Sequence, residues 1–324
     1  MTPSIHRRAW MVLAALTLSS AVAVAQGTGS PVRVILPVGA GSGVDTIVRA
    51  AQNALAKALG QPVVIENLPG AGGITGTQAI VKAAPDGNTI GVVSNNHAVN
   101  PSVFKTMPYD GIRDLTPISV VGATPFVLVV NPNKVPARNA KELQAFLQAR
   151  PGQTNFASSG NGTIIHLAGE MFIDAAGVDS RHIPYKGMGP MIADLIGGQV
   201  EWGVAALPAV QGHLKSGALR AIGVMGSQRV ASLPELPTLA EQGFPDVDVG
   251  GWFAVVAPAG LPAAQVQRIH AAVVAAFADP EVKAAMARQE NIIHPTSPEA
   301  ALQFFKTEQA RYARLVQKAQ VKLD

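Results

Sequence analysis

The sequence predicts an α/β protein made of two lobes that are joined by crossing strands. Three observations support this prediction. Short runs rich in β-branched residues alternate with longer helical runs, as in βαβ units. This alternation is interrupted near Pro125 and then resumes. An apolar extended run near residue 250 follows the second alternation and is succeeded mainly by helices, so we expect the chain to return to its first lobe.

Length and composition agree with two globular domains. The chain has 324 residues, of which 48% are hydrophobic and 14% charged, which is enough apolar material for large packed cores. Such a composition excludes a disordered chain. Beyond the N-terminus, no apolar run reaches the ~18 residues that a membrane-spanning helix requires.

The first 25 residues have the pattern of a secretory signal peptide. Arg7 and Arg8 provide a basic start, Ala9–Val24 an apolar body, and small residues precede Ala25. We expect cleavage after Ala25, with a retained membrane anchor as the alternative. Because the chain has no cysteine, export without disulfides favours a Gram-negative periplasm.

Charge and residue types exclude several classes of function. Removing Arg7 and Arg8 lowers the formal net charge from +4 to +2, and no run of Lys or Arg exceeds two. The basic surface of a nucleic-acid-binding protein is therefore not expected. Without cysteine there is no thiolate ligand, and the seven histidines show no metal-binding spacing. We predict no metal site and no cofactor.

The first alternation predicts a mostly parallel sheet with crossover helices. Its strands are nearly continuous apolar runs, as expected of strands buried on both faces. The expected elements are strand Val32–Pro37, helix Val44–Leu59, strand Pro62–Asn67, helix Ile74–Lys82 and strand Thr89–Ser94.

The crossing segment and the second alternation come next. Residues Pro117–Asn131 are extended, with a break at Gly122–Pro125. The elements expected after them are helix Ala140–Ala149, strand Thr154–Ser158, helix Thr163–Ala176, strand Arg181–Tyr185, helix Met188–Ile196, and strands Val200–Ala205 and Leu219–Val224.

The last part of the chain predicts a return to the first lobe. Val247–Ala257 is extended, and the residues after Pro262 are helical except for a short strand near Asn291–His294. We therefore assign residues 26–124 with 250–324 to domain 1, and residues 125–249 to domain 2. One continuous doubly wound sheet is the alternative.

A glycine-rich loop between the first strand and the first helix is a candidate anion site. Its backbone N–H groups can crowd around a ligand, and the helix dipole favours a carboxylate or phosphate by roughly 0.3 to 2 kcal/mol. The candidate residues are Val38, Gly39, Ala40, Gly41, Ser42, Gly43 and Asp45. Val44 stands where a dinucleotide fingerprint needs glycine, and no Gly-Lys pair forms a P-loop. An ordinary tight turn is the alternative, and Asp45 with Arg49 suggests an N-cap and a helix-face pair.

A second loop of the same kind follows a strand of the other lobe and leads into a helix that contains His166. If both loops lie at the carboxyl ends of their strands, both face the space between the lobes, where they suit a small anionic solute. Two unrelated turns are the alternative. The candidate residues are Ser158, Ser159, Gly160, Asn161, Gly162 and Thr163.

Patterns typical of enzymes are missing from the sequence. No serine lies in a G-x-S-x-G motif, and the carboxylates form no evident acid and base pair. We therefore predict no catalytic residues. The alternative is a periplasmic serine hydrolase that uses Ser158 or Ser159 with His166 or His97.

Many ordered motifs resemble those of one family, the substrate-binding proteins of tripartite tricarboxylate transporters, also called the Bug/TctC family. The resemblance covers essentially the whole chain after the signal peptide. The motifs are Gly41-x-Gly43-x-Asp45, Gly60–Val64, Glu66-Asn67, Pro69–Gly73, Pro85–Gly87, Tyr109-Asp110, Ser158–Gly162, His166–Glu170, Pro184–Gly187, Pro237–Glu241 and Ala257–Gly260.

The resemblance implies a two-lobed fold of the type II periplasmic binding protein kind. It also implies a non-catalytic monomer that closes by a hinge on a small di- or tricarboxylate and delivers it to membrane permease subunits. Presentation of the ligand to a membrane sensor kinase is an alternative with the same fold and site. The resemblance places the ligand at the two loops, with Ser94, His97 and Lys186 as flanking candidates.

The sequence departs from the family pattern at two places. The first loop lacks the aromatic residue and the hydroxyl of the usual P-F-A-P-G-G-G-T-D, because Val38 and Val44 stand there. Ala205-Ala206 stand where many members have Asp-Asn. We expect the less polar wall to admit a bulkier or aromatic carboxylate.

Overall fold

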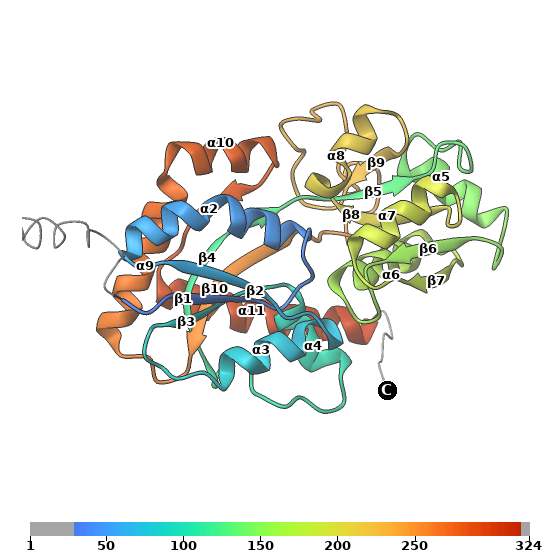
Figure 1. Cartoon of the computed structure of the whole chain (residues 1–324). Helices are drawn as coiled ribbons and strands as arrows, with labels where there is room; N and C mark the ends of the chain where they lie inside the picture. Colours follow the sequence, from blue (N-terminus) through green and yellow to red (C-terminus); the bar gives the residue numbers. More distant parts are fainter. Residues whose placement is uncertain (1–28, 319–324) are drawn as a thin grey trace, which may run out of the picture.

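The computed structural model describes residues 29–318 and arranges them in two lobes, each with its own β-sheet (Figure 1). This mixed α/β architecture confirms the fold class predicted from the sequence. The predicted signal peptide lies outside the described residues.

The sheet of the first lobe has the strand order β11-β4-β10-β3-β1-β2. β1 pairs in parallel with both β2 and β3, as the first alternation predicted, whereas β10 runs antiparallel to β3 and β4. The bounds are β1 Val32–Leu36, β2 Val63–Asn67, β3 Thr89–Ser94, β4 Leu115–Thr124, β10 Gly251–Pro258 and β11 Ile292–Ile293.

The sheet of the second lobe has the order β7-β6-β8-β5-β9. β6 pairs in parallel with β7 and β8, whereas β5 is antiparallel to β8 and β9. The bounds are β5 Phe126–Val130, β6 Asn155–Ser158, β7 Arg181–Pro184, β8 Trp202–Ala206 and β9 Arg220–Val224.

The helices follow the predicted order with two additions. The helices that pack on the first sheet are α2 Gly43–Leu59, α3 Ile74–Val81, α4 Asn96–Val103, α9 Ala263–Ala278, α10 Pro280–Arg288 and α11 Pro298–Lys318, with a 3-10 turn, η1, at Ala71–Gly73. Those of the second lobe are α5 Ala140–Gln148, α6 Ile164–Ala176, α7 Met188–Gly197 and α8 Leu207–Lys215. The sequence analysis did not predict α4, which contains Pro101, or α8, which begins with Leu207-Pro208.

The chain crosses between the lobes at the junction of β4 and β5 and returns to the first lobe at β10 (Figure 1). Only Pro125 separates β4 from β5, so the predicted break at Gly122–Pro125 was too long. Gly122 continues β4 because it pairs with both Phe253 and Ile293. A Cβ atom at this glycine would lie only 2.2 Å from the Ile292 carbonyl oxygen, so the close approach of β11 requires glycine.

The first sheet is buried on both faces. Because side chains alternate along a strand, Val34 and Leu36 of β1 pack with α2, α9 and α10, whereas Ile35 joins the cluster that contains α3, α4 and α11. This second cluster continues through Trp252 and Phe305 into the core of the other lobe. The hydrophobic core is therefore continuous across the junction between the lobes.

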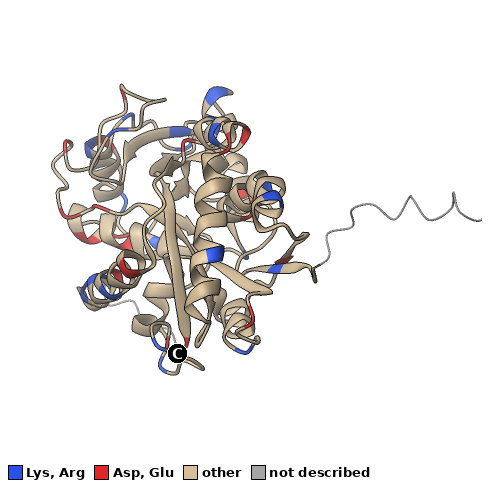
Figure 2. Cartoon of the chain, turned by 90° about the vertical axis from the view of Figure 1, so that its left-hand side faces the viewer, with Lys and Arg blue, Asp and Glu red and all other residues tan. Residues whose placement is uncertain are grey.

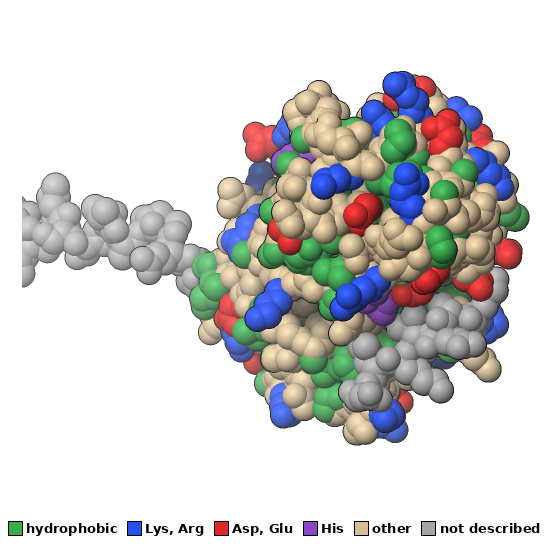
Figure 3. Space-filling view, turned by 90° about the vertical axis from the view of Figure 1, so that its right-hand side faces the viewer, with side chains coloured by type: hydrophobic (Ala, Val, Ile, Leu, Met, Phe, Trp, Pro, Cys, Tyr) green, Lys and Arg blue, Asp and Glu red, His purple; other side chains and the backbone are tan. Residues whose placement is uncertain are grey.

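Charged side chains are mixed over the surface. Figure 2 shows Lys and Arg interspersed with Asp and Glu on the side of the first lobe. On the face drawn in Figure 3, hydrophobic side chains occupy small separate areas among polar and charged ones. This distribution agrees with the low net charge calculated from the sequence.

Candidate functional site

The first candidate loop, residues 37–42, links β1 to α2 and ends in the helix cap Ser42. The Asp45 N–H donates to Ser42 Oγ at 3.3 Å, and the Gly41 N–H donates to Asp45 Oδ2 at 2.9 Å. The prediction that Asp45 is the N-cap was therefore wrong, because Ser42 precedes it and caps the helix. Gly39, Ala40 and Gly41 are exposed, next to first-turn N–H groups that have no acceptor within the helix.

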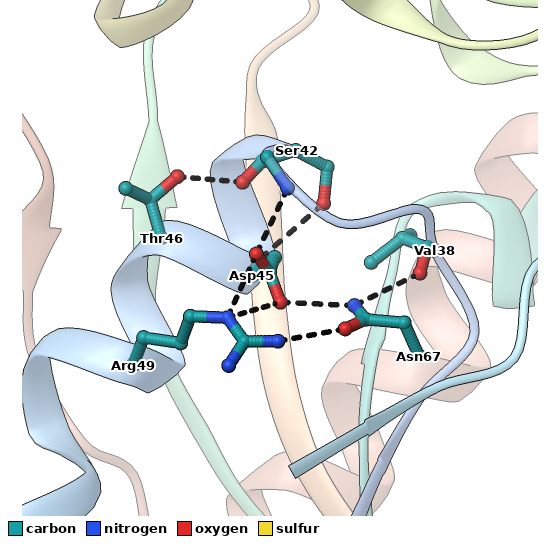
Figure 4. A network of polar contacts seen from close by, with 7 residues as sticks. Val38, Ser42, Asp45, Thr46, Arg49 and Asn67 are labelled. Carbon is teal, nitrogen blue, oxygen red and sulfur yellow. Dashed lines mark hydrogen bonds and ion pairs between the residues drawn. The ribbon is translucent and has the colours of Figure 1, made fainter.

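Asp45 is the centre of the network that fixes this loop (Figure 4). Arg49 Nε lies 2.9 Å from its Oδ1, and Asn67 Nδ2 donates to the same oxygen at 2.9 Å and to the Val38 carbonyl at 3.2 Å. Burial alone would raise the pKa of Asp45, but hydrogen bonds from Arg49, Gly41 and Asn67 outweigh it and hold this pKa below its ordinary value. These donors are hydrogen-bonded to both oxygens of the buried Asp45 carboxylate. Asp45 therefore fixes the shape of the loop, and Arg49 neutralises the charge of this carboxylate.

The second candidate loop, residues 158–163, links β6 to α6 in the other lobe. Thr163 caps α6: its Oγ1 accepts a hydrogen bond from the His166 N–H at 3.3 Å and donates one to the Gly160 carbonyl at 2.8 Å. The Gly162 N–H donates to His166 Nδ1 at 3.1 Å. Gly162 has a φ of 68°, a left-handed conformation that glycine adopts without strain. Asn161 is exposed at the tip of the loop.

Two stacked imidazole rings, those of His166 and His182, support the second loop. The rings of His166 and His182 lie 3.7 Å apart and are nearly parallel, with an angle of 7° between them. His182 Nε2 lies 2.6 Å from Ser158 Oγ, and His166 Nε2 lies 3.3 Å from Glu170 Oε1. Burial and the neighbouring His166 lower the pKa of His182 to about 3, so this ring is neutral at physiological pH.

The geometry of Ser158 and Ser159 does not suit a nucleophile. Ser158 lies close to His182, but its side chain is fully buried and hydrogen-bonded to the Gly160 carbonyl. A pKa near 3 also makes His182 a weak general base at neutral pH. The Ser159 hydroxyl donates to Thr163 Oγ1 at 3.3 Å rather than to an imidazole. The arrangement therefore supports a loop scaffold.

The two lobes meet beside the second loop. The Ile164 N–H, the first of α6, donates to Asn96 Oδ1 of the first lobe at 2.9 Å. Asn96 is the first residue of α4 and follows the end of β3. This hydrogen bond brings the N-terminus of α6 next to the residues that follow Ser94 at the end of β3.

The comparisons with known proteins agree on one family. The model of the tripartite tricarboxylate transporter family receptor matches residues 47–321. This chain belongs to that family. Protein BugT of Bordetella pertussis is a relative of this receptor chain, with 37% identity over 295 residues that cover 90% of each chain.

Solved structures of similar proteins give the same assignment for this tripartite tricarboxylate receptor. The periplasmic binding protein BugD matches with a TM-score of 0.84 and 32% identity, over 90% of this chain and 98% of its own. The R. palustris protein Rpa4515 with adipate matches with a TM-score of 0.86 and 29% identity, over 91% of this chain and 99% of its own. The Bug/TctC resemblance predicted from the sequence is confirmed.

Of the flanking candidates in the receptor, Ser94 and His97 line one small cavity with Val38 and Asn96. The His97 ring is buried against Tyr109 and Phe305, and its Nε2 lies 2.9 Å from the Gly111 carbonyl. Burial lowers the pKa of His97 to about 4. The neutral ring therefore donates from Nε2, and within the described chain its Nδ1 has no hydrogen-bond partner. His97 is mainly a residue of the core.

Lys186 is exposed on a turn that is hydrogen-bonded to the second loop. The Tyr185 N–H donates to the Ser158 carbonyl at 3.0 Å, and the Gly187 N–H donates to the Ser159 carbonyl at 3.1 Å. The Tyr185 hydroxyl donates to Asp194 at 2.8 Å and anchors the turn. This turn holds the Lys186 backbone beside the loop.

Several residues that support the candidate site were not predicted from the sequence. Asn67 and His182 support the two loops, and Asn96 joins the lobes. Asn67 was quoted only as part of a motif, and nothing in the sequence places His182 under Ser158. Ala205 and Ala206 end β8 and are both buried.

Residues 29–318 contain neither a cluster typical of a metal site nor a helix typical of a membrane span. Within this range, no group of three or more His, Cys, Asp or Glu residues is arranged to hold a metal ion. Likewise, none of the helices there combines the length and the apolar character needed to cross a bilayer.

Proposed function

We propose that this protein is a periplasmic receptor that binds a small organic carboxylate between its two lobes and delivers it to the permease of a tripartite tricarboxylate transporter. The proposal depends on two loops of the same kind, residues 38–45 in the first lobe and residues 158–163 in the second. Each loop follows a strand and leads into a helix N-terminus, and the Asn96 to Ile164 hydrogen bond links the first lobe to the helix that follows the second loop. Helix N-termini and loop N–H groups attract carboxylates.

The membership of the family and the adipate in the similar R. palustris structure support a carboxylate as the ligand. We propose Val38–Gly43, Ser94 and Ser158–Thr163 as ligand-binding residues, and Lys186 as a charge beside the second loop that attracts the ligand without contacting it. His97 and Asp45 take part by shaping the site. The exposed N–H groups of the loops donate to the carboxylate, and closure of the lobes removes water and strengthens these hydrogen bonds.

The division into domains that we propose has residues 26–124 with 250–324 in one domain and residues 125–249 in the other. The hinge is then formed by the segments around Pro125 and residue 250, where the chain crosses between the lobes. β8 ends in the buried residues Ala205 and Ala206. We propose that this apolar end of the strand favours a bulkier or aromatic carboxylate over a small hydrophilic one.

The first experiment is a thermal shift of the refolded, ligand-free mature protein with adipate, malate, citrate, aspartate and benzoate. A ligand at about 100 times its Kd adds about 2.7 kcal/mol to the free energy of unfolding, which raises the Tm measurably. A rise with one class of carboxylate supports the proposal. No rise with any of the five contradicts it.

Delivery to the transporter is tested separately, by capture of partners from solubilised membranes with the ligand-loaded protein. Capture of the permease subunits supports transport. Capture of a sensor-kinase ectodomain without the permease contradicts it and assigns the protein to ligand presentation.

A further inference from the structure

Asn96 occupies a place where both lobes and the proposed ligand meet. Its side chain starts from the first residue of α4 in the first lobe, and its Oδ1 accepts a hydrogen bond from the Ile164 N–H of the second lobe at 2.9 Å. It also lines the small cavity that contains Val38 and Ser94, two of the residues proposed to bind the ligand.

The hydrogen bond fixes which way the Asn96 amide points. An N–H donor needs an acceptor, so the oxygen of the amide must face Ile164 and the NH₂ group must face the other way. Among residues 29–318, no acceptor is hydrogen-bonded to Asn96 Nδ2. Asn96 is only half-buried, which leaves this NH₂ group able to bind a further partner.

An acceptor for this NH₂ group is expected from the ligand. The carboxylate beside the first loop, Asp45, is already occupied by Arg49, Asn67 and Gly41. A ligand carboxylate between the loops would supply the missing acceptor, and a hydrogen bond to an ionised acceptor is stronger than a neutral one.

We infer that Asn96 is a ligand-binding residue whose NH₂ group donates to the ligand carboxylate while its oxygen is held by the second lobe. This inference rests on the proposed function and extends it to a residue outside the predicted loops. Because the Ile164 N–H orients the amide only when the lobes are together, Asn96 makes ligand binding and closure support each other.

The test measures the affinity of Asn96 variants for adipate, malate, citrate, aspartate and benzoate by calorimetric titration. Asn96→Asp keeps an oxygen for the Ile164 N–H but replaces the donor with a negative charge, so we expect affinity to fall about 100-fold. Asn96→Ala loses both contacts, and we expect a fall of about tenfold or more. Asn133→Asp adds the same charge at an exposed position after β5 and should change the affinity less than twofold.

A proline at residue 164 tests the contact between the lobes. Proline lacks the N–H and is well tolerated at the first position of a helix, and the extended conformation of Thr163, with φ of −71° and ψ of 160°, is compatible with it. We expect Ile164→Pro to weaken binding several-fold compared with Ile164→Val, which controls for the loss of side-chain volume. In the Asn96→Ala background this difference should disappear.

The outcomes separate the inference from the proposed function. If the wild-type protein binds a carboxylate and Asn96→Asp binds it equally well, the ligand contact is wrong and the proposed function survives. If Ile164→Pro is equally harmful with and without Asn96, the contact between the lobes is not what orients the amide. If the wild-type protein binds none of the five carboxylates, both the proposed function and the ligand contact of Asn96 are overturned.

Discussion

The two loops of the proposed site serve the same purpose but are supported by different chemistry. The first loop is exposed and is fixed by an ionised carboxylate, Asp45, with Arg49 and Asn67 as partners. The second loop is more buried and is fixed by imidazoles, with His166 accepting from the Gly162 N–H and His182 contacting Ser158. A carboxylate and an imidazole change charge in different pH ranges, so acid should separate the two supports.

Acidification should give the largest effect on stability, because it protonates two histidines whose pKa values are lowered, His182 beside the second loop and His97 in the core of the first lobe. The pKa of His182 is lowered to about 3 and that of His97 to about 4, whereas an unfolded chain has histidine pKa values of about 6.5. Between those values the unfolded state binds more protons, so the free energy of unfolding falls as the pH falls. For the buried His97 this loss reaches about 3 kcal/mol near pH 4.

Urea unfolding at pH 7, 6, 5 and 4 measures this loss. His97→Gln and His182→Gln place an amide nitrogen near the position of Nε2. In each variant the free energy of unfolding should therefore depend less steeply on pH. The pKa of Asp45 is lowered, so its stabilisation is present above the ordinary Asp pKa of about 3.9 and is lost only as the pH falls below it. If Asp45→Asn made the free energy of unfolding less dependent on pH between pH 6.5 and 5, this contrast between the carboxylate and the imidazoles would be wrong.

Removing the charge of Asp45 should give the next largest effect. Asp45→Asn leaves Arg49 without its ion pair and places an NH₂ group among donors, so we expect a loss of about 2 kcal/mol or more in the free energy of unfolding. Adipate affinity, if adipate is the ligand, should fall at least tenfold because the loop loses its shape.

Glu66→Gln is the matched control for Asp45→Asn. Glu66 pairs with Arg33 at 2.8 Å in the same lobe, but this pair is exposed at the sheet edge. Exposed pairs contribute about 1 kcal/mol or less. Equal losses in the two variants would mean that Asp45 acts only as a surface ion pair.

Replacing His166 should have a smaller effect, because one hydrogen bond is removed rather than several. His166→Leu leaves the buried Gly162 N–H without its acceptor, which costs about 1 to 2 kcal/mol and should weaken ligand binding several-fold. His166→Asn places its oxygen near the position of Nδ1 and should restore most of the affinity. Titration of both variants at pH 7 checks this, and failure of asparagine to restore binding would show that the stacked ring itself is required.

The sequence predicted the elements of the fold because most of them have a local signal. The strands are apolar runs between turn residues, and the predicted β3, Thr89–Ser94, agrees with the structure at both ends. Helix α4 was missed because its asparagines and Pro101 are poor helix formers. Tertiary contacts stabilise it: Val99 is fully buried, and Asn95 before it bonds to Gly250 and Tyr312.

The candidate site was predicted as loops but not as a supported structure. Glycine and serine clusters are local signals, so residues 38–45 and 158–163 could be found directly. Their supports are distant in the sequence: Asn67 lies 22 residues from Asp45, His182 lies 24 residues from Ser158, and Asn96 lies 68 residues from Ile164. Only the packing of the sheets brings these partners together, and a single sequence contains no signal for that.

Replacing Lys186 should give the smallest effect on binding. This change tests whether the second loop depends on a charged side chain, as the first loop depends on Asp45. The Lys186 side chain is exposed, and within the described chain it forms no ion pair, so its attraction to an anionic ligand acts through water and is screened by salt. We expect Lys186→Gln to weaken carboxylate binding two- to fivefold at low salt, mainly through a slower association rate, and to have almost no effect at 0.5 M salt. Stopped-flow binding at two salt concentrations measures this. A large loss that persists at high salt would mean that Lys186 contacts the ligand directly, and the second loop would then depend on an ionised side chain just as the first depends on Asp45.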